Sequence, residues 1–390
     1  MDISCHYGDY NIVIKIRIPL DTKFNIIGRD FRVYLFHEKR VGEKMYYSKI
    51  CALIPARSGS KSVKDKNIRL MDGKPMIAYS IQDALKSKYI DKVVVSTDSE
   101  KYADIAREYG ADVPYLRPDS ISSDTSLDIE VFQHFLDWLI SEGYELPELL
   151  IHLRPTHPIR SIDDIDRMIS IMLNNPEIDA IRSVAPTREV PYKMWLFDDD
   201  ELMRPLVTCD IPEAYNAPRQ ILPQVYMQNA CIDVIRTSTI MDKKSMTGDK
   251  IAGYKMNYDF DIDTEDDFLR AERFLTLREK VKAGEKIKIV CDIDGVIAQK
   301  TPGNKYDQAI PNQTTVSILQ KLHQQGHTIV LHTARGYATG IDWESVTQNQ
   351  MAEWGIPYEK LVFGKPDADF YIDDKLITLQ DLSAFLFKND

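Results

Sequence analysis

The chain has 390 residues, of which 49 are Lys or Arg and 60 are Asp or Glu, so its formal net charge is −11. This length accommodates two or three domains. The acidic balance argues against bulk binding to nucleic acid or to an anionic membrane surface, because both need basic patches. The five cysteines form no Cys-x-x-Cys pair, which argues against a disulfide framework and a zinc site. Because we find no signal peptide and no apolar run of membrane-spanning length, we expect a cytoplasmic protein.

Residues 1–44 carry the least interpretable pattern. The run NIVIKIRI alternates apolar and polar side chains, which is typical of an edge strand. We interpret residues 1–44 as an N-terminal extension of unknown role.

Residues 45–275 alternate strand-like and helix-like segments. Short apolar runs predict buried strands at KICALIPA, DKVVVSTD and ELLIHLRPT, and helical spacing predicts helices at MIAYSIQDALKSKYI, EKYADIAREYG and LDIEVFQHFLDWLISEG. Such alternation predicts an α/β fold with a Rossmann-like, mostly parallel sheet covered on both faces. Ligands of these sheets bind beyond the carboxyl ends of the strands.

Residues 276–286 are polar and predict a helix end and a linker. Residues 287–390 then begin a second alternation of strands and helices, from IKIVCDID to ADFYIDD. They predict a second, smaller α/β domain.

A basic loop follows the first strand of the larger domain. Small residues in Pro55-Ala56-Arg57-Ser58-Gly59-Ser60-Lys61 allow backbone N–H groups to face phosphates. Arg57, Lys61 and Lys66 supply the positive charge that a departing pyrophosphate needs. The alternative is a solvated basic loop without a ligand.

Carboxylates also follow predicted strands. Asp261 and Asp263 are separated by one residue at a strand end, so they point to the same side of the sheet and suit Mg²⁺. A solvated acidic turn is the alternative reading. Asp98 follows another strand and predicts either a metal or nucleotide contact or the N-cap of the next helix.

These motifs resemble those of the acylneuraminate cytidylyltransferase family, whose usual pattern is Ala-Arg-x-x-Ser-Lys-Gly followed by Lys-Asn. Ser62 stands where the family usually has Gly. Matches recur in order at residues 116–118, 123–125, 153–160, 218–224 and 261–264. The resemblance implies a nucleotide-binding set of Ala56, Arg57, Ser60, Lys61, Lys66, Asn67, Asp98 and Arg117, of which Arg57, Lys61 and Lys66 are also catalytic. It implies acceptor binding by Arg154, Lys193, Arg219, Gln220 and Asn229, a metal at Asp261 and Asp263, and a homodimer or higher homo-oligomer formed through residues 187–217.

Two departures concern the acceptor. Met227 replaces a basic residue, and Arg154 stands where sialic acid enzymes often carry Gln. We therefore expect an anionic acceptor, either a sialic acid-like nonulosonic acid or a related sugar acid. A phosphonate or a phosphorylated small molecule is the alternative.

The C-terminal segment contains a second ordered set of motifs, namely Asp292-Ile293-Asp294, Thr333, Lys365 and Asp373-Asp374. This set resembles the haloacid dehalogenase phosphatases. The resemblance implies a nucleophilic Asp292, an acid–base Asp294, and Thr333 and Lys365 holding a phosphoryl group. It also implies Mg²⁺ bound by the carboxylates of Asp292, Asp294, Asp373 and Asp374.

The combined hypothesis is a bifunctional, Mg²⁺-dependent enzyme. The larger domain would transfer CMP from CTP to the acceptor, and the smaller would hydrolyse the phosphate ester of a small molecule. The alternatives are a transferase that uses a nucleotide sugar, and a regulatory or scaffolding protein with vestigial sites.

Overall fold

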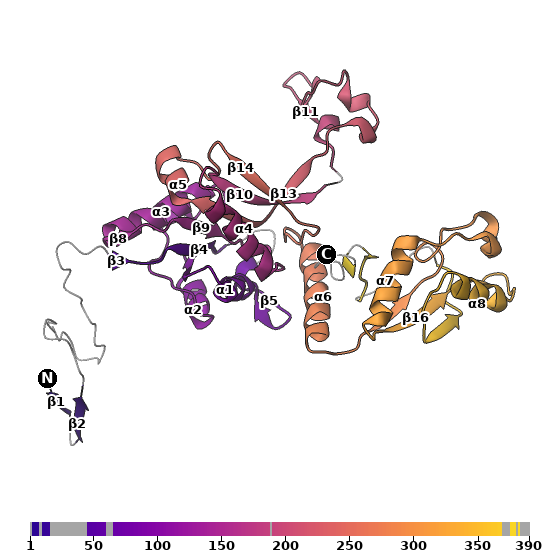
Figure 1. Ribbon diagram of the computed structural model, residues 1–390, viewed down its shortest axis with the longest axis horizontal. Coiled ribbons are helices and arrows are strands. Elements are labelled where there is room, and N and C mark those ends of the chain that lie inside the picture. The colour runs from indigo at the N-terminus through magenta and orange to yellow at the C-terminus, as the bar shows by residue number, and fades with distance from the viewer. Residues whose placement is uncertain are drawn as a thin grey trace.

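The computed structural model describes residues 2–7, 10–15, 45–59, 65–187, 189–368, 375–379 and 381–382 (Figure 1). Near the N-terminus, β1 (Asp2–Tyr7) and β2 (Tyr10–Lys15) form an antiparallel hairpin. The strand predicted at NIVIKIRI is therefore present as β2, and its pairing partner is β1.

A six-stranded sheet forms the centre of the larger α/β unit, in the order β14-β10-β13-β9-β4-β7. Its strands, in chain order, are β4 (Ile50–Pro55), β7 (Lys92–Ser96), β9 (Leu149–His152), β10 (Ala180–Pro186), β13 (Tyr226–Arg236) and β14 (Ile251–Lys255). Strand β4 runs parallel to β7 and β9, and β10 runs parallel to β14. Only β13 is antiparallel to its neighbours in this sheet. The expected mostly parallel α/β sheet is thus confirmed.

Helices cover both faces of this sheet. They are α1 (Met76–Lys86), α2 (Glu100–Glu108), α3 (Asp128–Ser141), α4 (Ile162–Asn174), α5 (Thr237–Lys243) and α6 (Glu265–Lys282). Ile50, Ala52 and Ile54 of β4 share a core with α1, α2, α4 and α6. The intervening Cys51 and Leu53 pack with α3 and α5 on the other face. Side chains alternate between faces along a strand, so an entirely apolar β4 supplies both cores.

An arm interrupts the sheet between β10 and β13 and stands away from the helices in Figure 1. It contains the hairpin of β11 (Trp195–Phe197) and β12 (Met203–Pro205). Short 3₁₀ turns at Pro191–Lys193, Ala214–Asn216 and Arg219–Ile221 complete it. Because the chain re-enters the sheet from the end at which it left, β13 runs antiparallel.

The C-terminal part contains a parallel three-stranded sheet in the order β15-β16-β17. Its elements are β15 (Lys288–Cys291), α7 (Gln313–Gln324), β16 (Thr328–Thr333), α8 (Glu344–Glu353) and β17 (Lys360–Phe363). Strand β15 lies within IKIVCDID, where a strand was predicted. The predicted strand at ADFYIDD lies largely outside the described residues.

Helix α6 continues to Lys282, so residues 276–282 form the helix end expected in the segment 276–286. Leu277 of this helix end packs against the apolar core of the C-terminal part, which gives these helical turns a partner.

The remaining elements are short. They are β3 (Met45–Tyr46) with β8 (Tyr144–Glu145), β5 (Leu70–Met71) with β6 (Lys74–Pro75), and 3₁₀ turns at Lys66–Ile68, Asp119–Ile121, Pro302–Asn304 and Tyr306–Gln308. Among the described helices, none has both the length and the apolar character that a membrane crossing requires.

Candidate functional site

A cavity of about 230 Å³ opens where β4 and β9 end, at the carboxyl edge of the large sheet. The loop after β4 contributes Arg57, the following 3₁₀ turn contributes Lys66 and Asn67, and Arg117 and Arg154 complete the basic part of its wall. Segments from across the sequence therefore bring together five of the predicted site residues. This position matches the expected ligand site of a parallel sheet.

Asp98 fixes the basic loop. Its two carboxylate oxygens accept hydrogen bonds from the backbone N–H and the hydroxyl of Ser58, both at 2.7 Å. The N-cap of α2 is Ser99 instead. The N-cap prediction for Asp98 is thus wrong; its carboxylate holds the loop after β4, and its contact with a metal or nucleotide stays a prediction.

Arg57 and Asn67 are held next to each other at the mouth of the cavity. The amide of Asn67 donates to the carbonyl oxygen of Arg57 at 3.0 Å, and Arg57 Nη2 lies 2.6 Å from Asp124 Oδ1. Ala56, also predicted at this site, is buried under the loop. Ser60 and Lys61 lie outside the described residues.

Arg117 lies in the wall of the cavity. Its side chain is largely buried, and Nε donates to Ser122 Oγ at 3.1 Å. Its Nη2 has no hydrogen-bond partner within the described structure. Burial lowers the pKa of this guanidinium, so an anionic or oxygen-rich ligand would relieve the cost of its desolvation.

Lys66 joins the cavity to the predicted metal motif. Its ammonium group donates to the carbonyl oxygen of Ile262 at 2.5 Å and lies 3.5 Å from Asp263 Oδ1. The side chain of Lys66 is almost completely buried. The contact places residues 259–263, the acidic turn before α6, beside the basic loop, although the two are far apart in sequence.

The carboxylates of the acidic turn suit a cation. Burial and the charges of the neighbouring Asp263 and Asp259 raise the pKa of Asp261. Within the described residues, no cluster of three or more His, Cys, Asp or Glu side chains could hold a metal on its own. A metal here would therefore take further oxygen ligands from a bound phosphate chain or from water, as Mg²⁺ commonly does.

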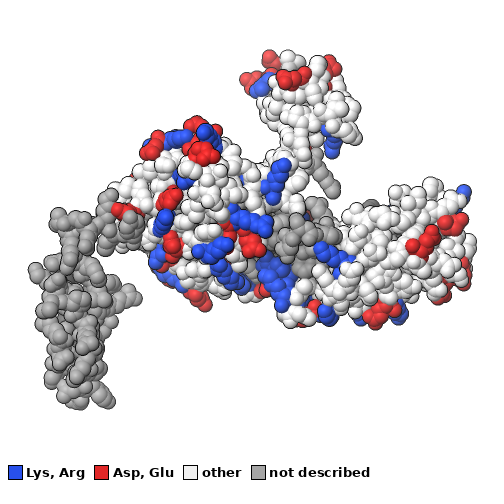
Figure 2. All heavy atoms as spheres, viewed as in Figure 1, with Lys and Arg blue, Asp and Glu red and all other residues white. Residues whose placement is uncertain are grey.

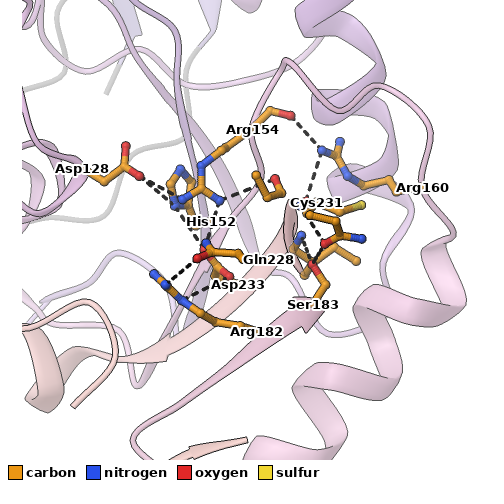
Figure 3. Close-up of polar contacts among 12 residues, drawn as sticks. Asp128, His152, Arg154, Arg160, Arg182, Ser183, Gln228, Cys231 and Asp233 are labelled. Atoms are coloured by element: carbon orange, nitrogen blue, oxygen red, sulfur yellow. Dashed lines mark hydrogen bonds and ion pairs between the residues drawn. The ribbon is translucent and has the colours of Figure 1, made fainter. Parts of the chain in front are cut away.

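Arg154 lies on the floor of the cavity within a network of charged side chains (Figure 3). Its Nη1 donates to Asp233 Oδ2 at 3.0 Å, and its Nη2 donates to Asp128 Oδ2 at 2.9 Å. Burial opposes the charge of Arg154, but the two carboxylates raise its pKa overall. Sequence reasoning missed Asp233, and the signal for it was a charged residue inside the apolar run CIDVI.

Other acceptor-side predictions lie away from this cavity. Lys193, Arg219 and Gln220 are in the arm, where Lys193 Nζ donates to the carbonyl oxygens of Tyr215 at 3.0 Å and Ala217 at 2.6 Å. Asn229 is buried, and its side-chain oxygen accepts from Ser183 Oγ at 2.6 Å. Acceptor binding by Asn229 stays a prediction; in the described structure its side chain is engaged by Ser183 in the interior.

The C-terminal sheet gathers its own motif residues at its carboxyl edge. Asp292 follows β15, Thr333 ends β16, and Lys365 follows β17. The Lys365 ammonium group donates a short hydrogen bond to Asp292 Oδ2. Asp373 and Asp374 lie outside the described residues.

Arg335 is the residue of this second site that sequence reasoning missed. Its Nε and Nη2 each donate to an oxygen of Asp294 at 2.8 Å. Its Nη1 donates to Thr347 at 3.1 Å and to Gln350 at 2.7 Å. The side chain is fully buried. Its position two residues after Thr333, in an otherwise small-residue turn, was the available signal.

Comparisons with known proteins converge on one family. The family described as Cytidylyltransferase matches residues 51–287. The chain is 32% identical over 238 residues to the CMP-N,N'-diacetyllegionaminic acid synthase of Legionella pneumophila, covering 60% of this chain and 98% of that protein. It is 35% identical over 240 residues to the post-translational flagellin modification protein B of Campylobacter coli, covering 60% of this chain and 98% of that protein. It is 31% identical over 260 residues to the N-acylneuraminate cytidylyltransferase of Escherichia coli O18:K1:H7, covering 67% of this chain and 58% of that protein.

Proposed function

Because the chain belongs to the cytidylyltransferase family, we propose that it transfers CMP from CTP to an anionic sugar acid and releases pyrophosphate. The observation that carries this proposal is the convergence of Arg57, Lys66 and Arg117 on one cavity beside the acidic turn. Two of the relatives named above carry names of enzymes that act on nonulosonic acids, which favours an acceptor of that class. A phosphonate or a phosphorylated small molecule is the alternative acceptor.

The proposed reaction is an in-line displacement at the α-phosphorus of CTP. A hydroxyl oxygen of the acceptor forms the new P–O bond and releases its proton to solvent water. The bond from the α-phosphorus to the bridging oxygen breaks, and its electron pair leaves on pyrophosphate. Arg57 and Lys66 bind the phosphate chain and stabilise the charge that gathers on the departing pyrophosphate. Mg²⁺, held by Asp261 and Asp263, would neutralise phosphate charge when bound. Arg117, whose Nη2 has no hydrogen-bond partner within the described structure, would bind the nucleoside part of CTP.

We also propose that the arm mediates homodimerisation. It exposes large apolar side chains, including Phe197 at 72%, Leu202 at 68% and Ile221 at 58%. Most of its visible surface is uncharged (Figure 2). Exposed apolar surface of this extent marks interaction sites, and a second copy of the chain would bury it.

The test of the transferase proposal is pyrophosphate release with Mg²⁺, CTP and a panel of N-acetylneuraminic acid, N,N'-diacetyllegionaminic acid, pseudaminic acid, sugar phosphates and phosphonates. Release with CTP, but not with ATP, GTP or UTP, and with one class of acceptor supports the proposal. A folded protein that fails to bind CTP contradicts it. Hydrolysis of a nucleotide sugar in place of CTP would instead favour the alternative transferase.

A second function is proposed for residues 287–390, as a Mg²⁺-dependent hydrolase of phosphate monoesters. The supporting observation is that Asp292, which follows β15, contacts Lys365, which follows β17, across the end of the intervening strand β16, where Thr333 lies. Asp292 would attack phosphorus, the alcohol would leave with a proton, and water would then cleave the aspartyl-phosphate to release phosphate. Asp292 with Asp373 and Asp374 would hold the metal, whereas Asp294 is engaged by Arg335.

This second proposal is tested with p-nitrophenyl phosphate and Mg²⁺. We expect hydrolysis by the full chain and none by an Asp292→Asn variant that still releases pyrophosphate from CTP. Hydrolysis that persists in Asp292→Asn would contradict the assigned nucleophile. A folded protein with no turnover of p-nitrophenyl phosphate or of sugar phosphates would favour a regulatory or vestigial role for this segment.

A further inference from the structure

Asp233 is a charged side chain with no exposed surface in the middle of the large sheet. On β13 it stands directly opposite His152 of β9 and opposite Arg182 of β10. Residues that face each other across neighbouring strands share one face of a sheet. Three strands therefore form a polar row that reaches the floor of the nucleotide cavity at His152.

This buried carboxylate holds Arg154 in place. Arg154 Nη1 donates to Asp233 Oδ2 at 3.0 Å, while Asp128 takes Nη2 at 2.9 Å (Figure 3). The other oxygen of Asp233 lies 3.6 Å from Arg182 Nε. Asp233 cannot touch a ligand itself, whereas Arg154 lines the cavity and keeps 19% of its side chain exposed.

His152 does not supply the positive charge that balances Asp233 and Asp128. It lies 3.8 Å from Asp233 Oδ2 and 3.9 Å from Asp128 Oδ2, and neither of its nitrogens has a hydrogen-bond partner within the described structure. Burial and the charge of Arg154 lower the pKa of His152 to about 3, so its ring is neutral. Arginine therefore balances the negative charge of Asp233 and Asp128, and the position of Arg154 depends on these two carboxylates.

We propose that Asp233 is a positioning residue, which fixes Arg154 so that its remaining N–H groups bind a neutral oxygen of the acceptor, such as a hydroxyl or an acyl carbonyl. This inference rests on the proposed transferase function. Two carboxylates already balance the charge of Arg154, so a further carboxylate gains little there, while a neutral hydrogen-bond acceptor still finds oriented donors. Arg154 would therefore select among acceptors by their polar substituents rather than by their acidic group.

A double-mutant cycle tests the inference. We compare wild type, Asp233→Asn, Arg154→Gln and the double variant, measuring kcat, the KM for CTP and the KM for whichever nonulosonic acid the wild type uses best. We expect Asp233→Asn to raise the acceptor KM about tenfold, because the guanidinium of Arg154 loses its orientation and with it one hydrogen bond to the acceptor. The CTP KM should stay within about twofold of wild type. In the Arg154→Gln background, Asp233→Asn should have no further effect.

Additive effects of the two substitutions on the acceptor KM would overturn the inference, because Asp233 would then act independently of Arg154. An equal rise in the CTP KM would overturn it too. Asp179→Asn is the matched control. Asp179 accepts hydrogen bonds from a lysine and from backbone groups, but it lies before the first residue of β10, at the end of that strand away from the cavity. The KM values of Asp179→Asn should therefore match those of wild type.

Removing a buried charge partner can destabilise the fold, so a milder variant accompanies Asp233→Asn. Asp128 holds the same guanidinium but is 44% exposed, and Asp128→Asn should raise the acceptor KM in the same direction by a smaller factor. An acceptor KM unchanged in Asp128→Asn and in a folded Asp233→Asn overturns the positioning role while the transferase function stands. A wild type inactive with every acceptor overturns the transferase function, and this inference falls with it.

Discussion

The ammonium group of Lys66 and the carbonyl oxygen of Ile262 are 2.5 Å apart, although 196 residues separate them in the chain. This hydrogen bond connects the basic loop after β4 to the acidic turn before α6. The buried side chain of Lys66 thus connects the two halves of the proposed phosphate site, one cationic and one anionic.

The first prediction is that Lys66→Met lowers kcat for pyrophosphate release about a hundredfold, or by ~2.7 kcal/mol in transition-state stabilisation. The substitution removes a charge from the phosphate site and leaves the carbonyl of Ile262 unpaired. Steady-state kinetics with CTP and the best acceptor provide the measurement. Lys282→Met, at an exposed lysine near the end of α6, is the control. Equal kcat values for wild type and Lys66→Met would remove Lys66 from the catalytic site.

The second prediction concerns the metal. Asp261→Asn should raise the Mg²⁺ concentration required for half-maximal activity at least about tenfold, because a crowded carboxylate that favours a cation is lost. Calorimetry should also show that Mg²⁺ no longer strengthens CTP binding in this variant. Asp266→Asn changes an exposed carboxylate of the same acidic stretch, on the first turn of α6, and should behave as wild type. A normal Mg²⁺ requirement in Asp261→Asn would place the metal elsewhere.

The sequence predicted a parallel sheet from three of its strands, β4, β7 and β9, because each is a short apolar run flanked by turn residues, whereas β10, β13 and β14 were not assigned. It also indicated the basic loop, which follows the end of β4. Asp261 and Asp263 were expected at a strand end, but β14 ends at Lys255 and residues 256–264 belong to no strand. The antiparallel direction of β13 was not predictable from the same patterns, because it depends on where the arm returns the chain.

Side-chain partners were harder to predict than element positions. Arg154 was expected to face an acceptor, but its binding to Asp233 and Asp128 depends on the register of β9 with β13 and on the place of α3. Asn229 matched a motif position, yet its burial follows from the local path of β13, where Ala230 adopts a positive φ of 52°. Such contacts are three-dimensional, and no local pattern reports them.

The third prediction addresses the C-terminal site. Arg335→Lys should lower kcat for p-nitrophenyl phosphate at least about tenfold, because a lysine cannot hold both oxygens of Asp294 in the position needed for proton transfer. Pyrophosphate release from CTP should be unchanged. Lys360→Gln, at the start of β17 and therefore at the opposite end of that strand from Lys365, is the control. Full phosphatase activity in Arg335→Lys would show that the paired hydrogen bonds from Arg335 to Asp294 are not needed for hydrolysis.

The fourth prediction concerns the arm. Light scattering coupled to size-exclusion chromatography should give a dimer or larger oligomer for wild type and a monomer for Phe197→Asp, because a charge at an apolar interface opposes association. Leu85→Asp places the same charge at an exposed leucine of α1 and should leave the assembly intact. A monomeric wild type at micromolar concentration would contradict the assembly role of the arm.

The fifth prediction concerns acid stability and His152. The pKa of His152, about 3 in the folded protein, lies below the value of about 6.5 expected in the unfolded chain. Between these values the unfolded chain binds a proton that the folded protein does not, so the free energy of unfolding falls as the pH falls through this window. From pH 7.5 to pH 5 this group alone would remove roughly 2 kcal/mol. The loss should be absent in His152→Gln, whose side chain does not titrate.

Urea unfolding followed by circular dichroism at pH 7.5 and pH 5 measures this difference. Other groups also titrate, so the quantity of interest is how much more stability the wild type loses than His152→Gln does. His323→Gln, at an exposed histidine near the end of α7, should lose as much as wild type. If His152→Gln loses as much stability as wild type on acidification, His152 is not held neutral, and its charge would have to be counted among those that balance Asp128 and Asp233.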